Sequence, residues 1–96
     1  MHFGERLRAL REGRGLLQRQ LAANLEIDTP MFSKIERGER KAKRAQVAQL
    51  ADLLHTDKQE LLTLWLADQI FDMVKDEGDA SDTLNIVIDW IQNIQK

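Results

Sequence analysis

Apolar side chains recur at three- and four-residue intervals along most of the chain, which is the pattern of amphipathic helices. Phe3, Leu7 and Leu10 share one face of the first such segment, which Gly13 and Gly15 bring to an end. No stretch alternates apolar with polar residues over the length of a strand. The pattern therefore predicts an all-α fold of six helices, at about residues 3–14, 18–25, 29–37, 45–54, 58–77 and 81–95.

Two of the predicted helices are bounded by residues that favour helix ends. Asp28 is a good N-cap for the third helix, because a carboxylate accepts hydrogen bonds from the free N–H groups of the first turn. Pro30 falls in that turn, where its missing N–H costs nothing, and Gly38 ends the helix. Asp57 with Glu60 predicts a start resembling a capping box for the fifth helix.

Composition supports a small globular protein without disulfides. The 96 residues are 43% hydrophobic and 31% charged, with one Pro and five Gly, which fits one helical domain with at most a short appendage. Cysteine is absent, so the sequence holds no disulfide framework and no thiolate nucleophile. No apolar run approaches the length of a bilayer span, and no signal-peptide core is visible, so a cytoplasmic protein that does not enter a membrane is expected.

Charge divides sharply between the two halves of the chain. Residues 1–44 carry eleven Lys or Arg against six Asp or Glu, a balance of +5. Residues 45–96 carry three against ten, a balance of −7. This polarity favours a basic face that contacts phosphates and an acidic remainder with another task. Charge that is merely distributed over a solvated surface remains the alternative.

The second and third predicted helices are short and are joined by three residues, 26–28, and a basic segment follows them. That is the geometry of a helix-turn-helix, whose second helix enters the major groove of DNA. Gln18-x-x-Leu21-Ala22, followed by Phe32-Ser33-Lys34-Ile35-Glu36-Arg37-Gly38, closely resembles the phage repressor and Cro family, the XRE-type regulators, over roughly residues 3–66. The resemblance implies a five-helix, repressor-like DNA-binding domain from a bacterium or phage.

The outward face of the third helix holds the predicted base-contacting residues, because they project away from Phe32 and Ile35. Lys34 can donate to guanine O6 or N7, and Arg37 to guanine or phosphate. The resemblance places base contacts at Thr29, Pro30 and Lys34, although Pro30 replaces a usual polar residue and offers only apolar contact. A solvated face without DNA remains the alternative. The predicted set is Thr29, Pro30, Ser33, Lys34 and Arg37.

Phosphate contacts form a separate predicted class, because they position a protein on DNA without reading sequence. The resemblance implies that the amide of Gln18, at the start of the second helix, grips a phosphate. The basic connector after the third helix would run along the DNA backbone. Any one of its cations could simply be solvated, but four in five residues favour a phosphate-binding role: Arg40, Lys41, Lys43 and Arg44.

Several residues have predicted structural roles within the motif. Ala22 is small where the two helices pass closely, and Ile27 fills the angle between them. Glu36 faces inward and needs a cation, and the resemblance pairs it with Arg11 of the first helix. Family members usually carry Gly in a left-handed conformation at the position of Glu26, where a side chain costs about 1 kcal/mol.

The C-terminal third predicts a dimerisation surface, so we divide the chain into a DNA-binding domain, 1–66, and a helical extension, 67–96. The fifth helix is apolar around much of its circumference and is expected to be buried on more than one side. The sixth carries a seam with three- and four-residue spacing, although it could instead complete the core of its own chain. The predicted dimerisation residues are Leu84, Val87, Ile88, Trp90, Ile91 and Ile94.

The sequence therefore favours a sequence-specific transcriptional regulator that binds a palindromic operator in double-stranded DNA as a homodimer. A controller of a restriction-modification or toxin–antitoxin system remains open. So does a protein-interaction module that no longer binds DNA and meets a protein partner through its C-terminal helices. An enzyme is not expected, because His2 and His55 are the only imidazoles and no phosphate loop, metal spacing or nucleophile–base pair occurs. No cofactor, metal or catalytic residue is predicted.

Overall fold

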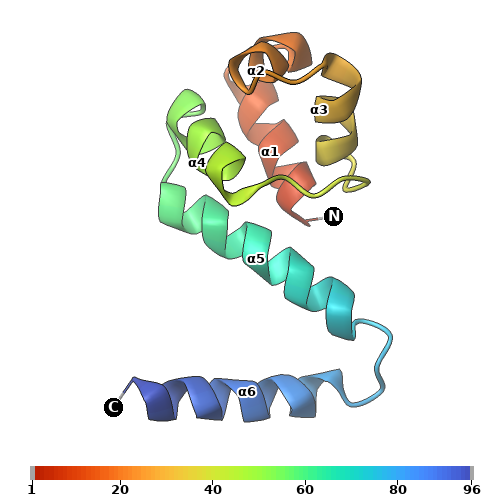
Figure 1. Ribbon diagram of the computed structural model, residues 1–96, viewed down its shortest axis with the longest axis vertical. Helices are drawn as coiled ribbons and strands as arrows, with labels where there is room; N and C mark the ends of the chain where they lie inside the picture. The colour runs from red at the N-terminus through yellow and green to blue at the C-terminus, as the bar shows by residue number, and fades with distance from the viewer. Residues whose placement is uncertain (1, 96) are drawn as a thin grey trace.

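The computed structural model describes residues 2–95, which form six α-helices and no strand (Figure 1). The all-α prediction is confirmed, and the largest departure is the end of the fifth helix, at Val74 instead of residue 77. None of the helices in this range is long and apolar enough to cross a membrane. In chain order they are α1 (His2–Gly13), α2 (Gln18–Asn24), α3 (Thr29–Glu36), α4 (Arg44–Leu53), α5 (Lys58–Val74) and α6 (Ala80–Ile94).

The hydrophobic core lies among the first five helices. Helix α1 packs against α3 and α5, α2 packs against α3, and α4 packs against α5. Each large apolar side chain buried in this way stabilises the fold by about 1.5–3 kcal/mol. The most deeply buried of them come from all five helices and the end of α4: Leu7, Leu21, Phe32, Val47, Leu50, Leu54 and Leu61.

The turn between α2 and α3 has the tight geometry that the motif requires. Glu26 has φ +59°, the left-handed conformation predicted for its position. The next N–H, that of Ile27, donates back to the carbonyl oxygen of Ala22 at 3.0 Å. The Asp28 side chain then accepts from the Met31 N–H at 2.7 Å, so it caps α3 as predicted. The turn thereby sets the angle between the two helices.

Within its own chain, helix α5 is buried on one side only, and its predicted burial on more than one side, which concerns a dimer, stays a prediction. Leu61, Trp65 and Asp68 face the core and are its buried residues. Leu66 and Ile70, on the opposite face, are exposed. The apolar circumference was interpreted correctly as a surface that favours burial, but a single chain supplies neighbours for only half of it.

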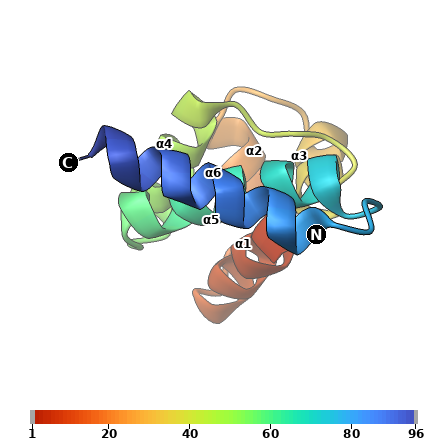
Figure 2. The ribbon, with the colours of Figure 1, turned by 90° about the horizontal axis from the view of Figure 1, so that it is seen from below.

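Helix α6 extends away from the domain. It follows a short acidic loop after α5, and its C-terminal end projects beyond the other helices (Figures 1 and 2). None of its residues is buried. The alternative in which the last helix completes the core of its own chain therefore does not hold in this structure.

Candidate nucleic-acid interface

Helix α3 presents a polar face to solvent because its apolar residues hold the opposite face in the core. Phe32 and Ile35 are almost fully buried, with exposed fractions of 0% and 2%. The predicted base-contacting residues lie on the other side, where Ser33 is half-buried and the remaining four are exposed: Thr29, Pro30, Lys34 and Arg37. The buried face of α3 therefore holds these predicted base-contacting residues on a rigid support.

The cation on α3, Lys34, and the one directly after it, Arg37, differ in how they are held. The Arg37 guanidinium donates to Ser33 Oγ at 2.6 Å and forms an ion pair with Glu39. The hydrogen bond from Arg37 lowers the pKa of the Glu39 carboxyl. Lys34 forms no ion pair within residues 2–95, so its ammonium group is free to donate to a base. The sequence analysis did not predict that Glu39 pairs with Arg37.

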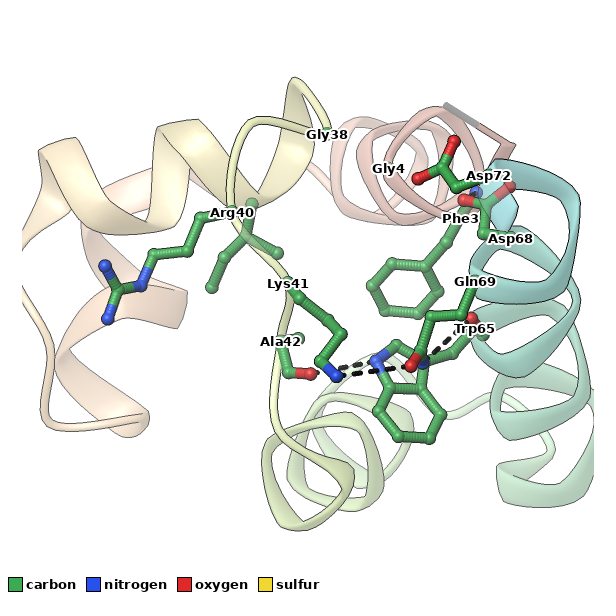
Figure 3. Close-up of a pocket in the computed structure, with 11 residues that line it drawn as sticks. Phe3, Gly4, Gly38, Arg40, Lys41, Ala42, Trp65, Asp68, Gln69 and Asp72 are labelled. Atoms are coloured by element: carbon green, nitrogen blue, oxygen red, sulfur yellow. Dashed lines mark hydrogen bonds between the residues drawn. The ribbon is translucent and has the colours of Figure 1, made fainter. Parts of the chain in front are cut away.

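The basic connector between α3 and α4 is fixed to α5 by two hydrogen bonds (Figure 3). Trp65 Nε1 donates to the carbonyl oxygen of Ala42 at 2.9 Å, in the buried interior. Lys41 Nζ donates to Gln69 Oε1 at 3.3 Å on the surface. Figure 3 shows Arg40 pointing away from these residues. The two hydrogen bonds therefore hold the connector, and the cations on it, in a fixed position relative to α5.

The three cations of the connector, and Arg44 at the start of α4, are not equivalent. All are exposed, yet the Arg44 guanidinium lies over the Trp65 ring, 5.1 Å from its centroid, which is a cation–π arrangement. Lys41 is among the residues that line a small cavity of about 100 Å³, together with Arg40, Trp65 and Asp72. Arg40 and Lys43 form no ion pair within the described range. These two are the cations most available to a phosphate.

Gln18, Glu36 and Arg11 form one network. Arg11 Nε donates to Glu36 Oε2 at 2.6 Å and Arg11 Nη2 to Glu36 Oε1 at 3.1 Å. Gln18 Nε2 donates to the same Oε1 at 3.0 Å, a contact that sequence reasoning did not predict. The shared carboxylate thus orients the Gln18 amide at the start of α2. The paired charges tie α1 to α3.

Two further contacts that support the site come from residues that the sequence did not single out. A Cβ atom added at Gly4 would lie 2.1 Å from the carbonyl oxygen of Glu36, so α1 can approach the end of α3 only with glycine there. The buried Asp68 carboxylate accepts from the Phe3 N–H at 2.7 Å and contacts His2 Nδ1 at 3.0 Å. It caps the start of α1 from α5. An acidic residue within an apolar helix was the one available signal for this role.

The sequence of residues 2–64 matches the family described as a helix-turn-helix domain. The match spans α1 to α4 and the first part of α5, and it therefore includes all the predicted base- and phosphate-contacting residues, which lie between residues 18 and 44. No curated protein matches the chain, and no solved structure does.

Proposed function

We propose, on the premise that this chain belongs to the helix-turn-helix domain family, that it is a sequence-specific transcriptional regulator that binds a palindromic DNA operator as a homodimer. The observation that carries the proposal is the exposed face of α3. Its cations project from a helix whose opposite face is fully buried, and a basic connector follows directly. In this repressor-like arrangement α3 is the helix that enters the major groove.

The exposed residues of α3 divide into those that read bases and those that assist. Lys34 is a donor for guanine O6 or N7. Arg37 reaches a base or a phosphate once it leaves Glu39. Thr29 offers a hydroxyl and a methyl group at the start of the helix, and Pro30 beside it makes apolar contact only.

Phosphate binding would come from groups on both sides of α3. The Gln18 amide, held by Glu36, lies at the start of α2, and the connector continues from the end of α3. Helix ends and cations at two separate places fix the orientation of a recognition helix in the groove. Because each neutralised phosphate releases counterions, the affinity is expected to fall steeply with salt. The connector supplies Arg40, Lys41, Lys43 and Arg44.

Homodimerisation would come from the C-terminal extension, residues 67–96. Its predicted residues on α6 are all at least partly exposed in the single chain. Two copies would place two α3 helices on half-sites about one turn of DNA apart, roughly 34 Å, so that protein symmetry matches an inverted repeat. Roles as a controller of a restriction-modification or toxin–antitoxin system are compatible with the same geometry.

The test is selection of bound sequences from a random pool of duplex DNA at physiological salt. We expect recovery of a short inverted repeat. In Lys34→Ala, one position in each half-site should lose its preference and binding should weaken by about tenfold or more, since a good base contact is worth about 1–3 kcal/mol. Lys58→Ala, an exposed lysine at the start of α5, is the matched control and should leave the selected sequence unchanged.

Weak, sequence-blind binding that Lys34→Ala does not alter would refute α3 as a reading helix. A protein-interaction module would then be the better account of the same fold.

A further inference from the structure

The C-terminal part of the molecule carries a large apolar surface that the chain itself leaves open. Monomeric proteins rarely expose contiguous apolar patches beyond a few hundred Å². Ten large hydrophobic residues of α5 and α6 are exposed, and we call them the C-terminal apolar surface: Leu66, Ile70, Phe71, Met73, Ile86, Val87, Ile88, Trp90, Ile91 and Ile94.

On α5 this surface includes a stripe opposite the core-facing residues. Leu66, Ile70 and Met73 follow a spacing of four and three residues, so they share one face of the helix. Leu66 and Ile70 also line a shallow groove of about 260 Å³, which extends to Ala67 and to Arg44 of α4. The stripe and the groove together have the shape of a surface against which another helix can pack.

On α6 the apolar residues extend too far around the helix for a single neighbour. At 3.6 residues per turn, the residues from Leu84 to Ile94 that are apolar cover roughly 200° of the circumference. One packing partner needs a stripe of about 100°. The remaining arc carries Asp82, Asn85 and Asp89. Helix α6 is therefore built to lie between two other apolar surfaces, with its acidic side in water.

The chain's own α5 covers α6 only near the loop that joins them. Val74, Ala80 and Leu84, closest to this loop, are half-buried. Away from it the two helices diverge, as Figure 1 shows, and Leu66 is 44% and Ile94 83% exposed at the open end. Away from the loop, both helices thus carry apolar side chains that their own chain leaves exposed.

The amount of exposed surface matches what a stable dimer buries. With about 200 Å² for a fully exposed large apolar residue, the exposed fractions of the ten residues amount to on the order of 1,000 Å² per copy. A standard stable interface takes about 800 Å² from each partner. The surface is large enough to hold two copies together without any other protein.

We propose that α6 of a second copy inserts between α5 and α6 of the first, and that the two copies do this reciprocally about a two-fold axis. Each α6 then has both of its required neighbours, one α5 stripe and one α6. This inference rests on the proposed homodimer and specifies its architecture, in which the extension interlocks instead of pairing along one α6 seam. The acidic loop residues Asp76, Glu77 and Asp79 would keep this interface away from DNA phosphates.

The absence of cysteine makes a direct test possible, since any disulfide must come from introduced residues. Full-length Ile70→Cys and Ile91→Cys chains, carrying different tags, are co-expressed and oxidised. We expect a higher yield of the disulfide that joins Ile70→Cys to Ile91→Cys than of either disulfide between two identical chains. Asp89→Cys, on the acidic side of α6, is the matched control and should form little disulfide with Ile70→Cys.

Two outcomes would overturn the proposal. Disulfides between two Ile91→Cys chains alone would indicate a simple α6 seam. If the chain stayed monomeric and formed no disulfide between chains, the C-terminal apolar surface would instead bind a different protein. Operator binding, measured on the same chains, separates this inference from the proposed function. If the chains still bind an inverted repeat but form no α5–α6 disulfide, only the proposed interlocked dimer is refuted. If they form the disulfide but do not bind DNA sequence-specifically, only the proposed regulatory function is refuted.

Discussion

At the scale of single residues, a few close contacts determine how α1 meets the rest of the domain. Gly4 of α1 lies against the backbone at the end of α3. Arg11, two turns further along α1, pairs with Glu36 of α3. Breaking a buried pair of this kind typically costs about 3–5 kcal/mol, because one charge is left without a partner. Both contacts place the helix that carries the predicted base-contacting residues.

Gly4→Ala is expected to destabilise the fold by about 2 kcal/mol or more, because its new methyl group would collide with a backbone carbonyl that cannot move freely. Gly13→Ala, in the same helix, has nothing within 4 Å of the added Cβ and should not lower the free energy of unfolding. Urea unfolding measures both. Equal effects of the two substitutions would show that the approach of α1 to α3 is not the limiting contact.

At the scale of elements, α3 and the connector act as one unit. The Trp65–Ala42 hydrogen bond fixes the connector to α5, while Glu39 holds Arg37 at the end of α3. Under the proposed function, the Glu39 carboxylate would compete with DNA for Arg37. Its negative charge would also repel DNA phosphates.

Glu39→Gln is expected to raise DNA affinity several-fold, because it releases Arg37 and removes a negative charge beside the predicted interface. The measurement is Kd at several salt concentrations, and the gain should shrink as salt rises. Glu60→Gln is the control, since Glu60 is an exposed partner of Arg6 at 3.6 Å on the α1–α5 side. If both variants gained equally, net charge alone would account for the effect, and Arg37 would not be held back.

At the scale of the whole molecule, the chain has two parts of opposite character. The helices α1 to α5 bury a continuous core, whereas α6 buries nothing. An isolated helix of fifteen residues is marginal in water, so α6 depends on a neighbour for its persistence. Assembly and the order of α6 are therefore expected to be coupled.

The two tryptophans report on the two parts separately. In Trp65→Phe the remaining Trp90, 62% exposed, should emit at long wavelength in dilute protein and shift to shorter wavelength as concentration rises. In Trp90→Phe the remaining Trp65, 8% exposed, should emit at short wavelength throughout. Fluorescence over a dilution series, compared with mass from light scattering, checks the coupling. A Trp90 emission independent of concentration would contradict it.

The local architecture could be predicted from the residue pattern alone. Helical periodicity and end residues predicted six helices, since Asp28 and Pro30 act on N–H groups of their own turn. The left-handed Glu26 followed from the resemblance, because the short connection leaves few conformations. The periodicity also indicated that Lys34 and Arg37 face away from the core. These features depend on residues within a few positions of one another, where the chain's own geometry restricts the outcome.

Contacts between distant segments could not be predicted from the residue pattern and are seen only in the folded chain. Asp68 caps α1 across 65 residues of sequence, and Trp65 holds the connector across 23. Neither contact produces a periodic pattern in the sequence, because a hydrogen bond between distant segments depends on how whole helices are placed. The one-sided burial of α5 was unpredictable for the same reason. Apolar periodicity shows that a face favours burial, and the arrangement of all the other helices decides whether its own chain can cover it.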